Sequence, residues 1–152
     1  MLRQFLVGGG VSVLNIAIHA VVMTIVVRVA QARGAESRPH PSLLLIAVMI
    51  PTVSVLMVTH TLEVIVWSLA YLLVGAAPAG TDLVYFAFVN YATLGYGDVV
   101  PLERWRLLGP ITAMNGVLLF GWSTAVIFEV LRRTLARSLD ISVRDQSGMR
   151  LD

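Results

Sequence analysis

Three long apolar stretches dominate the sequence, and a shorter apolar segment lies between the second and the third. No charged residue occurs between Arg3 and Arg28, and Glu63 carries the only formal charge of the second stretch. The third stretch, 107–128, is uncharged, and as a helix it would measure roughly 33 Å, which is enough to cross the hydrocarbon core of a membrane. The pattern predicts transmembrane helices at about 4–29, 42–75 and 106–135.

The composition agrees with membrane insertion. Hydrophobic residues make up 57% of the chain and charged residues 13%, where a soluble domain carries about a quarter charged residues. All 11 basic residues are arginines, and they form no basic patch. Without cysteine, disulfides and thiolate sites are absent. We therefore expect an integral membrane protein, and we exclude a soluble enzyme domain, a disordered protein and a nucleic-acid-binding protein.

The positions of the arginines predict the topology, because cytoplasmic segments carry an excess of basic residues. Arginines cluster in the first connection, 28–38, and near the C-terminus, whereas residues 75–81 contain none. This bias places the C-terminus in the cytoplasm, and the N-terminus and residues 76–105 outside. Arg104 and Arg106 do not follow the rule.

The segment between the second and third stretches is too short to cross a bilayer. Asp82 is suited to cap the start of a helix over 82–93, and the sequence Thr-Leu-Gly-Tyr-Gly-Asp follows at 93–98. A short helix, an extended glycine-bearing loop and a return to the same side predict a re-entrant segment. Irregular backbone at membrane depth occurs only where it is packed in protein or lines a water-filled path.

The residue types of this loop favour cation binding. Backbone carbonyls can replace the water that a cation sheds, and aiming successive carbonyls at one axis requires the alternating dihedrals that Gly95 and Gly97 allow. Thr93 adds a hydroxyl at the inner end. One loop cannot enclose an ion, so we expect several copies around an axis.

The sequence Thr93-Leu94-Gly95-Tyr96-Gly97-Asp98 resembles the selectivity filter of tetrameric potassium channels, and the third stretch resembles their inner helix. The resemblance covers about residues 45–135. It matches the minimal bacterial pore module, here preceded by one additional transmembrane helix. It implies an all-α membrane fold with an outer helix, a re-entrant pore helix and filter, and an inner helix in fourfold assembly. It also implies that K⁺ binds backbone oxygens of Thr93, Leu94, Gly95 and Tyr96 together with the Thr93 hydroxyl, and that Gly116 is the gating hinge.

Two positions next to the filter differ from the usual pattern of that family. Ala92 replaces a threonine and removes a hydroxyl below the filter, and Tyr85 takes the place of a bracing tryptophan. We expect Tyr85 to hydrogen-bond Asp98 from behind the filter, so that Tyr85 and Ala92 are the supporting positions.

Polar residues inside the second stretch form a second candidate site. His60 and Glu63 lie three residues apart on one helix face, and Glu63 is near mid-membrane. A charged carboxylate there requires a partner or a proton. One interpretation is a structural hydrogen bond; another is a pH-sensitive gate in which His60, Glu63 and His19 exchange a proton; a third is a lipid or ligand contact.

Other positions carry smaller predictions. The run Gly8-Gly9-Gly10 favours a close contact between helices. Asn115 faces either a cavity below the filter or another helix. Glu129 forms an ion pair with arginines one turn along its helix or contributes to a charged ring. We expect the polar tail, 142–152, to be disordered.

These observations predict three regions: an N-terminal transmembrane helix and cytoplasmic connection at 1–40, a potassium-channel-like pore domain at 41–135, and a short cytoplasmic tail at 136–152. The predicted function is a passive potassium-selective channel, with no enzyme activity and no cofactor beyond K⁺ as the permeant ion. The expected partners are further copies of the chain in a homotetramer and membrane lipid, with no nucleic acid and no soluble regulatory domain. The expected location is the bacterial inner membrane.

Three alternatives remain open from the sequence. A weakly selective or normally closed cation channel would follow if Ala92 and the changed aromatic residues loosen the filter. A transporter subunit normally strings several pore repeats on one chain and lacks the full Gly-Tyr-Gly. A non-conducting membrane scaffold would have no need of two glycines around a tyrosine.

Overall fold

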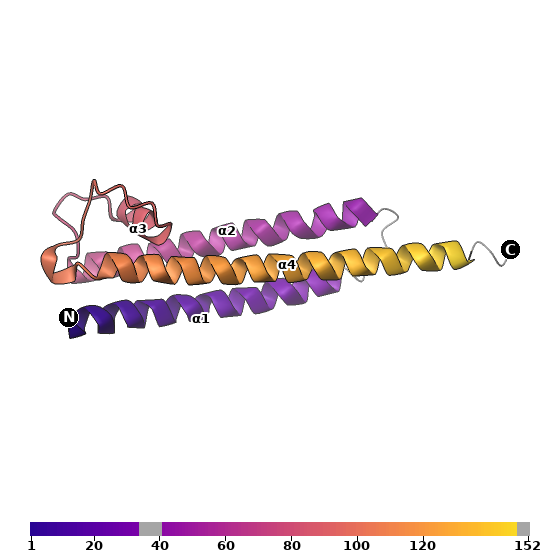
Figure 1. Cartoon of the computed structure of the whole chain (residues 1–152), viewed down its shortest axis with the longest axis horizontal. Coiled ribbons are helices and arrows are strands. Elements are labelled where there is room, and N and C mark those ends of the chain that lie inside the picture. The colour runs from indigo at the N-terminus through magenta and orange to yellow at the C-terminus, as the bar shows by residue number, and fades with distance from the viewer. Residues whose placement is uncertain (34–40, 149–152) are drawn as a thin grey trace. The chain divides into compact units, whose positions relative to one another are not determined.

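The computed structural model describes residues 1–33 and 41–148, and this part of the chain is all helical, with no strand. Its elements are α1 (Leu2–Arg33), α2 (Pro41–Val74), α3 (Leu83–Tyr91), the short 3₁₀ turn η1 (Glu103–Trp105) and α4 (Leu108–Gly148) (Figure 1). Three stretches are long and apolar enough to span a membrane, namely Leu2–Ala30, Leu43–Val74 and Glu103–Ala136. The predicted all-α fold and its three spans are therefore confirmed.

The C-terminal tail differs from the prediction. Helix α4 continues to Gly148, so the expected disorder is wrong for residues 142–148. No glycine or proline interrupts the chain between Gly121 and Gly148, and nine of the 26 residues between them are leucine, alanine or arginine, which favour helix. The rest of the predicted tail, 149–152, lies outside the described residues.

Contacts divide the chain into two compact units. The first unit comprises Met1–Val21 and Val58–Trp122, and the second comprises Val22–Met57 and Ser123–Asp152. The loop 93–98 and the polar residues around Glu63 all belong to the first unit. The predicted functional division into 1–40, 41–135 and 136–152 stays a prediction.

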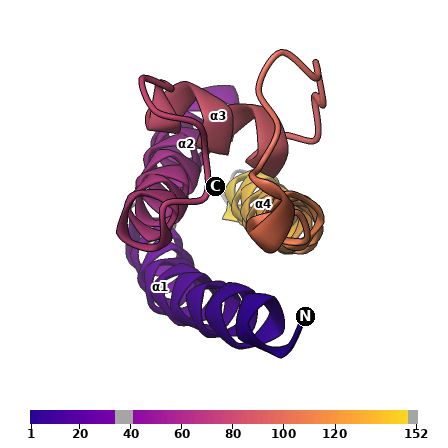
Figure 2. The same ribbon diagram turned by 90° about the vertical axis from the view of Figure 1, so that its left-hand side faces the viewer.

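An aromatic core holds the first unit together. Trp67 and Tyr71 of α2 pack against Phe86 and Tyr91 of α3, and Leu108 of α4 completes the cluster. The ring centroids of Tyr71 and Phe86 are 5.0 Å apart, within the range of favourable aromatic pairs. Figure 2 shows the result: α3 lies between the ends of α2 and α4.

The first half of α1 packs on α4 within the same unit. The Gln4 side-chain oxygen accepts a hydrogen bond of 2.7 Å from the backbone N–H of Leu107. A Cβ on Gly8 would lie 2.9 Å from two side-chain atoms of Ile111, whereas nothing lies within 4 Å of one on Gly9 or Gly10. The predicted close helix contact is therefore made by Gly8 alone.

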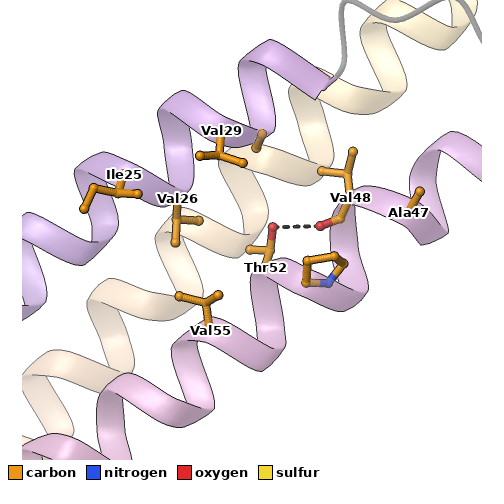
Figure 3. A pocket seen from close by; sticks show the side chains of 9 residues that line it. Ile25, Val26, Val29, Ala47, Val48, Thr52 and Val55 are labelled. Atoms are coloured by element: carbon orange, nitrogen blue, oxygen red, sulfur yellow. Dashed lines mark hydrogen bonds between the residues drawn. The ribbon is translucent and has the colours of Figure 1, made fainter.

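The second unit has its own apolar core, made by residues of α1, α2 and α4: Met23, Val26, Leu44, Val48, Leu56, Val126 and Val130. A cavity of about 190 Å³ lies between α1 and α2, lined mainly by valine, isoleucine and alanine (Figure 3). Pro51 also lines this cavity, and Thr52 beside it donates a 2.8 Å hydrogen bond to the carbonyl of Val48 (Figure 3). Among its described residues, this unit has no buried cluster of ionisable side chains like that of the first unit.

Glu129 forms the predicted ion pairs along its own helix. Arg132 donates to both carboxylate oxygens at 3.0 and 3.1 Å, and Arg133 donates to one of them. Because all three side chains are partly exposed, such pairs add little to stability.

Candidate functional site

The site begins with the short helix α3. The Asp82 carboxylate accepts hydrogen bonds from the backbone N–H groups of Val84 and Tyr85 at 3.0 and 3.1 Å, so it is the N-cap that the sequence predicts. The helix has nine residues and a length of roughly 13 Å, too short to cross a membrane. It ends at Tyr91, with Ala92 as its C-cap, immediately before the loop 93–98.

The backbone of this loop alternates between two conformations. Thr93, Gly95 and Gly97 have positive φ values of 60°, 58° and 78°, whereas Leu94 and Tyr96 between them do not. The alternation expected at the two glycines is confirmed. Thr93 extends it by one step, which the sequence did not predict, because β-branched residues rarely adopt positive φ. Such strained residues concentrate at functional sites.

The loop is open in the single chain. Leu94 is 52% exposed and Tyr96 is 65% exposed, although both side chains are large and apolar or aromatic. A Cβ added to Gly95 or Gly97 would meet no atom within 4 Å. The chain by itself therefore leaves this loop without the packing that irregular backbone requires at membrane depth.

A hydrogen bond behind the loop joins it to α3. The Tyr85 hydroxyl donates to Asp98 at 2.7 Å, as the sequence predicts. The second Asp98 carboxylate oxygen accepts from the backbone N–H of Val99 at 3.0 Å. The hydrogen bond to Asp98 raises the pKa of Tyr85 above its usual value, so the phenol keeps its proton and remains a donor.

A second set of hydrogen bonds attaches α3 to α2 and α4. Asn90 donates to the Tyr71 hydroxyl at 3.4 Å, and the Tyr71 and Thr112 hydroxyls lie 2.6 Å apart. Thr112 in turn donates to the carbonyl of Leu108 at 2.8 Å. Tyr71 and Thr112 were not predicted as functional residues. The only sequence signal for them was that polar side chains in apolar helices need partners.

Gly116 of α4 packs closely against Tyr91, the last residue of α3. A Cβ at this position would come within 2.1 Å of the carbonyl oxygen of Tyr91, so glycine is required for the close approach of α4 to α3. Helix α4 is continuous through Gly116. Its predicted role as a gating hinge stays a prediction.

The polar cluster around Glu63 contains more residues than the sequence predicted. One carboxylate oxygen lies 2.8 Å from Nδ1 of His19, and the other lies 3.0 Å from Nδ1 of His60. The Tyr91 hydroxyl donates to this second oxygen at 2.5 Å. His19 and Glu63 are fully buried. The structural hydrogen bonds expected for Glu63 are present, and proton exchange among these residues stays a prediction.

Asn115 faces neighbouring helices. Its side-chain oxygen accepts hydrogen bonds from the Trp67 indole at 3.0 Å and from Asn15 at 3.3 Å. Asn15 also donates to the backbone carbonyl of Glu63 at 3.2 Å. Of the two predicted positions for Asn115, the interhelical hydrogen bond is confirmed, and Asn15 of α1 is a partner that the sequence did not indicate.

The class of protein follows from this arrangement: a helical integral membrane protein with a short helix and an irregular loop between two apolar helices. A family model described as an ion channel matches residues 55–133, more than half of the chain, so the chain belongs to this ion channel family. The matched part contains α3, the loop and most of α4. No curated protein and no solved structure matches the chain significantly. Membership in this family indicates ion transport.

Proposed function

We propose that the chain is one subunit of a passive, potassium-selective channel in which four copies surround a common axis. The observation that carries the proposal is the loop Thr93–Asp98, whose backbone alternates in conformation directly after a short helix. K⁺ is the permeant ion, and the proposal includes no catalysis and no cofactor.

The chemistry of the loop supports a site for a dehydrated monovalent cation. Alternating dihedrals turn successive carbonyl groups toward the same side, which provides several neutral oxygen dipoles without a fixed negative charge. The oxygens of Thr93, Leu94 and Gly95, followed by that of Tyr96, are the proposed ligands, and the Thr93 hydroxyl is the innermost one. The carboxyl end of α3 adds a partial negative charge at the inner end of this row, beside Thr93.

The exposure of the loop supports assembly around an axis. A single strand provides carbonyls on one side of an ion only, and the loop has no packing partner on its other faces among the described residues. Four copies would close the ring and bury Tyr96 and Leu94. Homotetramer formation within membrane lipid is therefore part of the proposal.

The arrangement of the first unit supports the proposed orientation. The hydrogen bond between Gln4 and Leu107 brings the start of α1 close to η1, which supports a position of the N-terminus on the same membrane side as η1. Arg104, which does not follow the arginine rule, lies 3.4 Å from the carbonyl of Gly75 and donates to it at the end of α2. We propose a bacterial inner membrane location with the N-terminus outside and the C-terminus in the cytoplasm.

A flux assay in proteoliposomes tests the proposal. We expect uptake of K⁺ down its gradient, no comparable uptake of Na⁺, and loss of selective uptake in Gly97→Ala. The matched control is Gly80→Ala, because Gly80 has almost the same φ of 80° and an equally open environment but lies outside the loop. Subunit counting in the same vesicles would give four.

The assay also separates the alternatives. Equal uptake of K⁺ and Na⁺ would replace the proposal with a weakly selective channel. Tetramers that take up neither ion would favour a closed channel or a scaffold. Equal losses of K⁺ uptake in Gly97→Ala and Gly80→Ala would contradict the role of the loop as the ion-binding segment.

A further inference from the structure

The cluster around Glu63 brings together three side chains of the types that bind metal ions in proteins. His19 comes from α1, and His60 and Glu63 come from α2, so three ligand-type side chains meet in the core of the first unit. Their nearest ligand atoms all lie within 4.8 Å of one another. The side chains of His19 and Glu63 are 0% exposed and that of His60 is 13% exposed.

The geometry of these atoms suits a small divalent ion. Zinc binds imidazole nitrogen and carboxylate oxygen at about 2.0–2.2 Å, which places the ligand atoms of a tetrahedral site roughly 3.3 Å apart. The observed separations are 2.8 Å from His19 Nδ1 to Glu63 and 3.0 Å from His60 Nδ1 to Glu63. Side-chain adjustments on the order of an ångström would admit an ion between them.

The surroundings also suit an ion of this class. The ring of His60 packs against Phe120 with centroids 4.6 Å apart, and the ring of His19 packs against Trp122 at 5.3 Å. These aromatic rings limit access of water and fix the orientation of both imidazoles. A divalent ion would also compensate the negative charge of Glu63 in the membrane interior, where an isolated carboxylate is unfavourable.

We infer that His19, His60 and Glu63 form a binding site for a divalent transition-metal ion of the zinc type. The protein ligands are Nδ1 of each histidine and the Glu63 carboxylate, which leaves a further coordination position, as in zinc sites with three protein ligands. In the bound state both histidines carry their proton on Nε2, since a metal-bound nitrogen cannot also be protonated.

The site is connected to the loop through Tyr91. The Tyr91 hydroxyl donates to the same Glu63 oxygen that lies near His60, and Tyr91 is the last residue of α3. An ion that takes up the Glu63 carboxylate competes with this hydrogen bond and loosens the attachment of α3 just before Thr93. We therefore expect the bound ion to reduce conduction, a consequence that rests on the proposed channel function, whereas metal binding itself does not.

Cobalt binding to the full-length, tag-free protein in detergent micelles tests the site directly. Co²⁺ replaces Zn²⁺ in such sites, and a four-coordinate Co²⁺ ion gives strong visible absorption bands. We expect one Co²⁺ per chain with these bands, and their loss when Zn²⁺ is added. Glu63→Gln and His60→Gln should each weaken binding by more than about 100-fold, because each changes a direct ligand, and the loss of an outer-shell partner alone costs about 10–100-fold.

Two matched variants make the test specific. His40→Gln removes the remaining histidine of the chain, which lies outside the described residues, and should leave Co²⁺ binding unchanged. Tyr91→Phe removes the hydroxyl that donates to Glu63 and lies 3.0 Å from Nδ1 of His60, but it removes no metal ligand, so it should retain binding within a few-fold. Helix content and assembly size of each variant, measured alongside, identify any that fails to fold.

The results separate metal binding from channel function. Co²⁺ spectra without four-coordinate bands, or binding that Glu63→Gln leaves intact in a folded protein, would overturn the inference. If wild-type protein binds Co²⁺ as described, Zn²⁺ should reduce K⁺ uptake by wild-type vesicles but not by those containing Glu63→Gln. Binding without any effect on uptake would retain the site and reject its connection to the loop.

Discussion

Thr93 has a φ of 60°, a conformation that its branched side chain makes unfavourable, and the neighbouring residues hold it there. The backbone N–H of Thr93 donates to the carbonyl of Asn90 at 3.0 Å, and that of Leu94 donates to Val89 at 2.9 Å. Tyr85 holds the other end of the loop through Asp98. At this scale the loop depends on a few specific hydrogen bonds around its strained backbone.

Removing the phenol of Tyr85 tests one of these hydrogen bonds. Tyr85→Phe keeps the ring but leaves Asp98 without its donor from α3. We therefore expect the open probability of the channel to fall faster during sustained activation. Recordings in planar bilayers measure this decay. An unchanged conductance and decay would show that Tyr85 does not support the loop.

Tyr71→Phe is the corresponding change in the buried hydrogen-bond network. Its main effect should be on the stability of the protein, whereas that of Tyr85→Phe should be on the current. It leaves Asn90 without its acceptor and Thr112 without the Tyr71 hydroxyl, so we expect a loss of about 1 kcal/mol in stability, typical of an interhelical hydrogen bond. Thermal unfolding in detergent measures the loss. Tyr85→Phe is the control, since its exposed phenol should contribute little to stability, and equal effects of the two variants would contradict this assignment.

At the scale of elements, α3 is the segment that the rest of the first unit positions. Asp82 caps its start, the Asn90–Tyr71 hydrogen bond attaches its side, and Tyr91 attaches its end to Glu63. Gly116 of α4 lets the end of α3 sit against the helix. These contacts fix where the loop begins, and they come from both of the other α-helices in the matched part of the chain.

The close approach at Gly116 predicts a sharp difference between two glycines of α4. Gly116→Ala places a methyl group against the Tyr91 carbonyl and should destabilise the protein by about 1–3 kcal/mol. Gly121→Ala lies on the same helix with nothing within 4 Å, and should be neutral or slightly stabilising. Thermal unfolding of both variants measures the difference, and a Gly116→Ala protein as stable as Gly121→Ala would contradict the packing described here.

The sequence predicted the elements better than their contacts. Long apolar stretches and the Asp82 cap defined the three spans and α3, because length and charge alone decide which segments can cross a membrane. The side of α1 that packs on α4 could not be predicted, since apolar residues cover nearly all of its faces. His19 therefore entered the Glu63 cluster only as one possible proton partner, and Asn15 was not predicted at all.

At the scale of the whole molecule, the family match and the resemblance of the loop concern the same region. Residues 55–133 match an ion channel family, and this range includes α3, the loop and, from the Glu63 cluster, His60, Glu63 and Tyr91. The loop itself could be predicted from six consecutive residues, because its backbone conformation follows largely from the positions of two glycines. The proposed selectivity and the proposed fourfold assembly involve other copies of the chain, so they are tested on the assembled protein.

The most direct test of the central claim is the reversal potential of the purified protein in a planar bilayer with K⁺ on one side and Na⁺ on the other. We predict a reversal near the K⁺ equilibrium value, lost in Gly95→Ala and retained in Gly80→Ala. A reversal near zero in the wild-type protein would contradict potassium selectivity and direct attention to Ala92 and the surroundings of the loop.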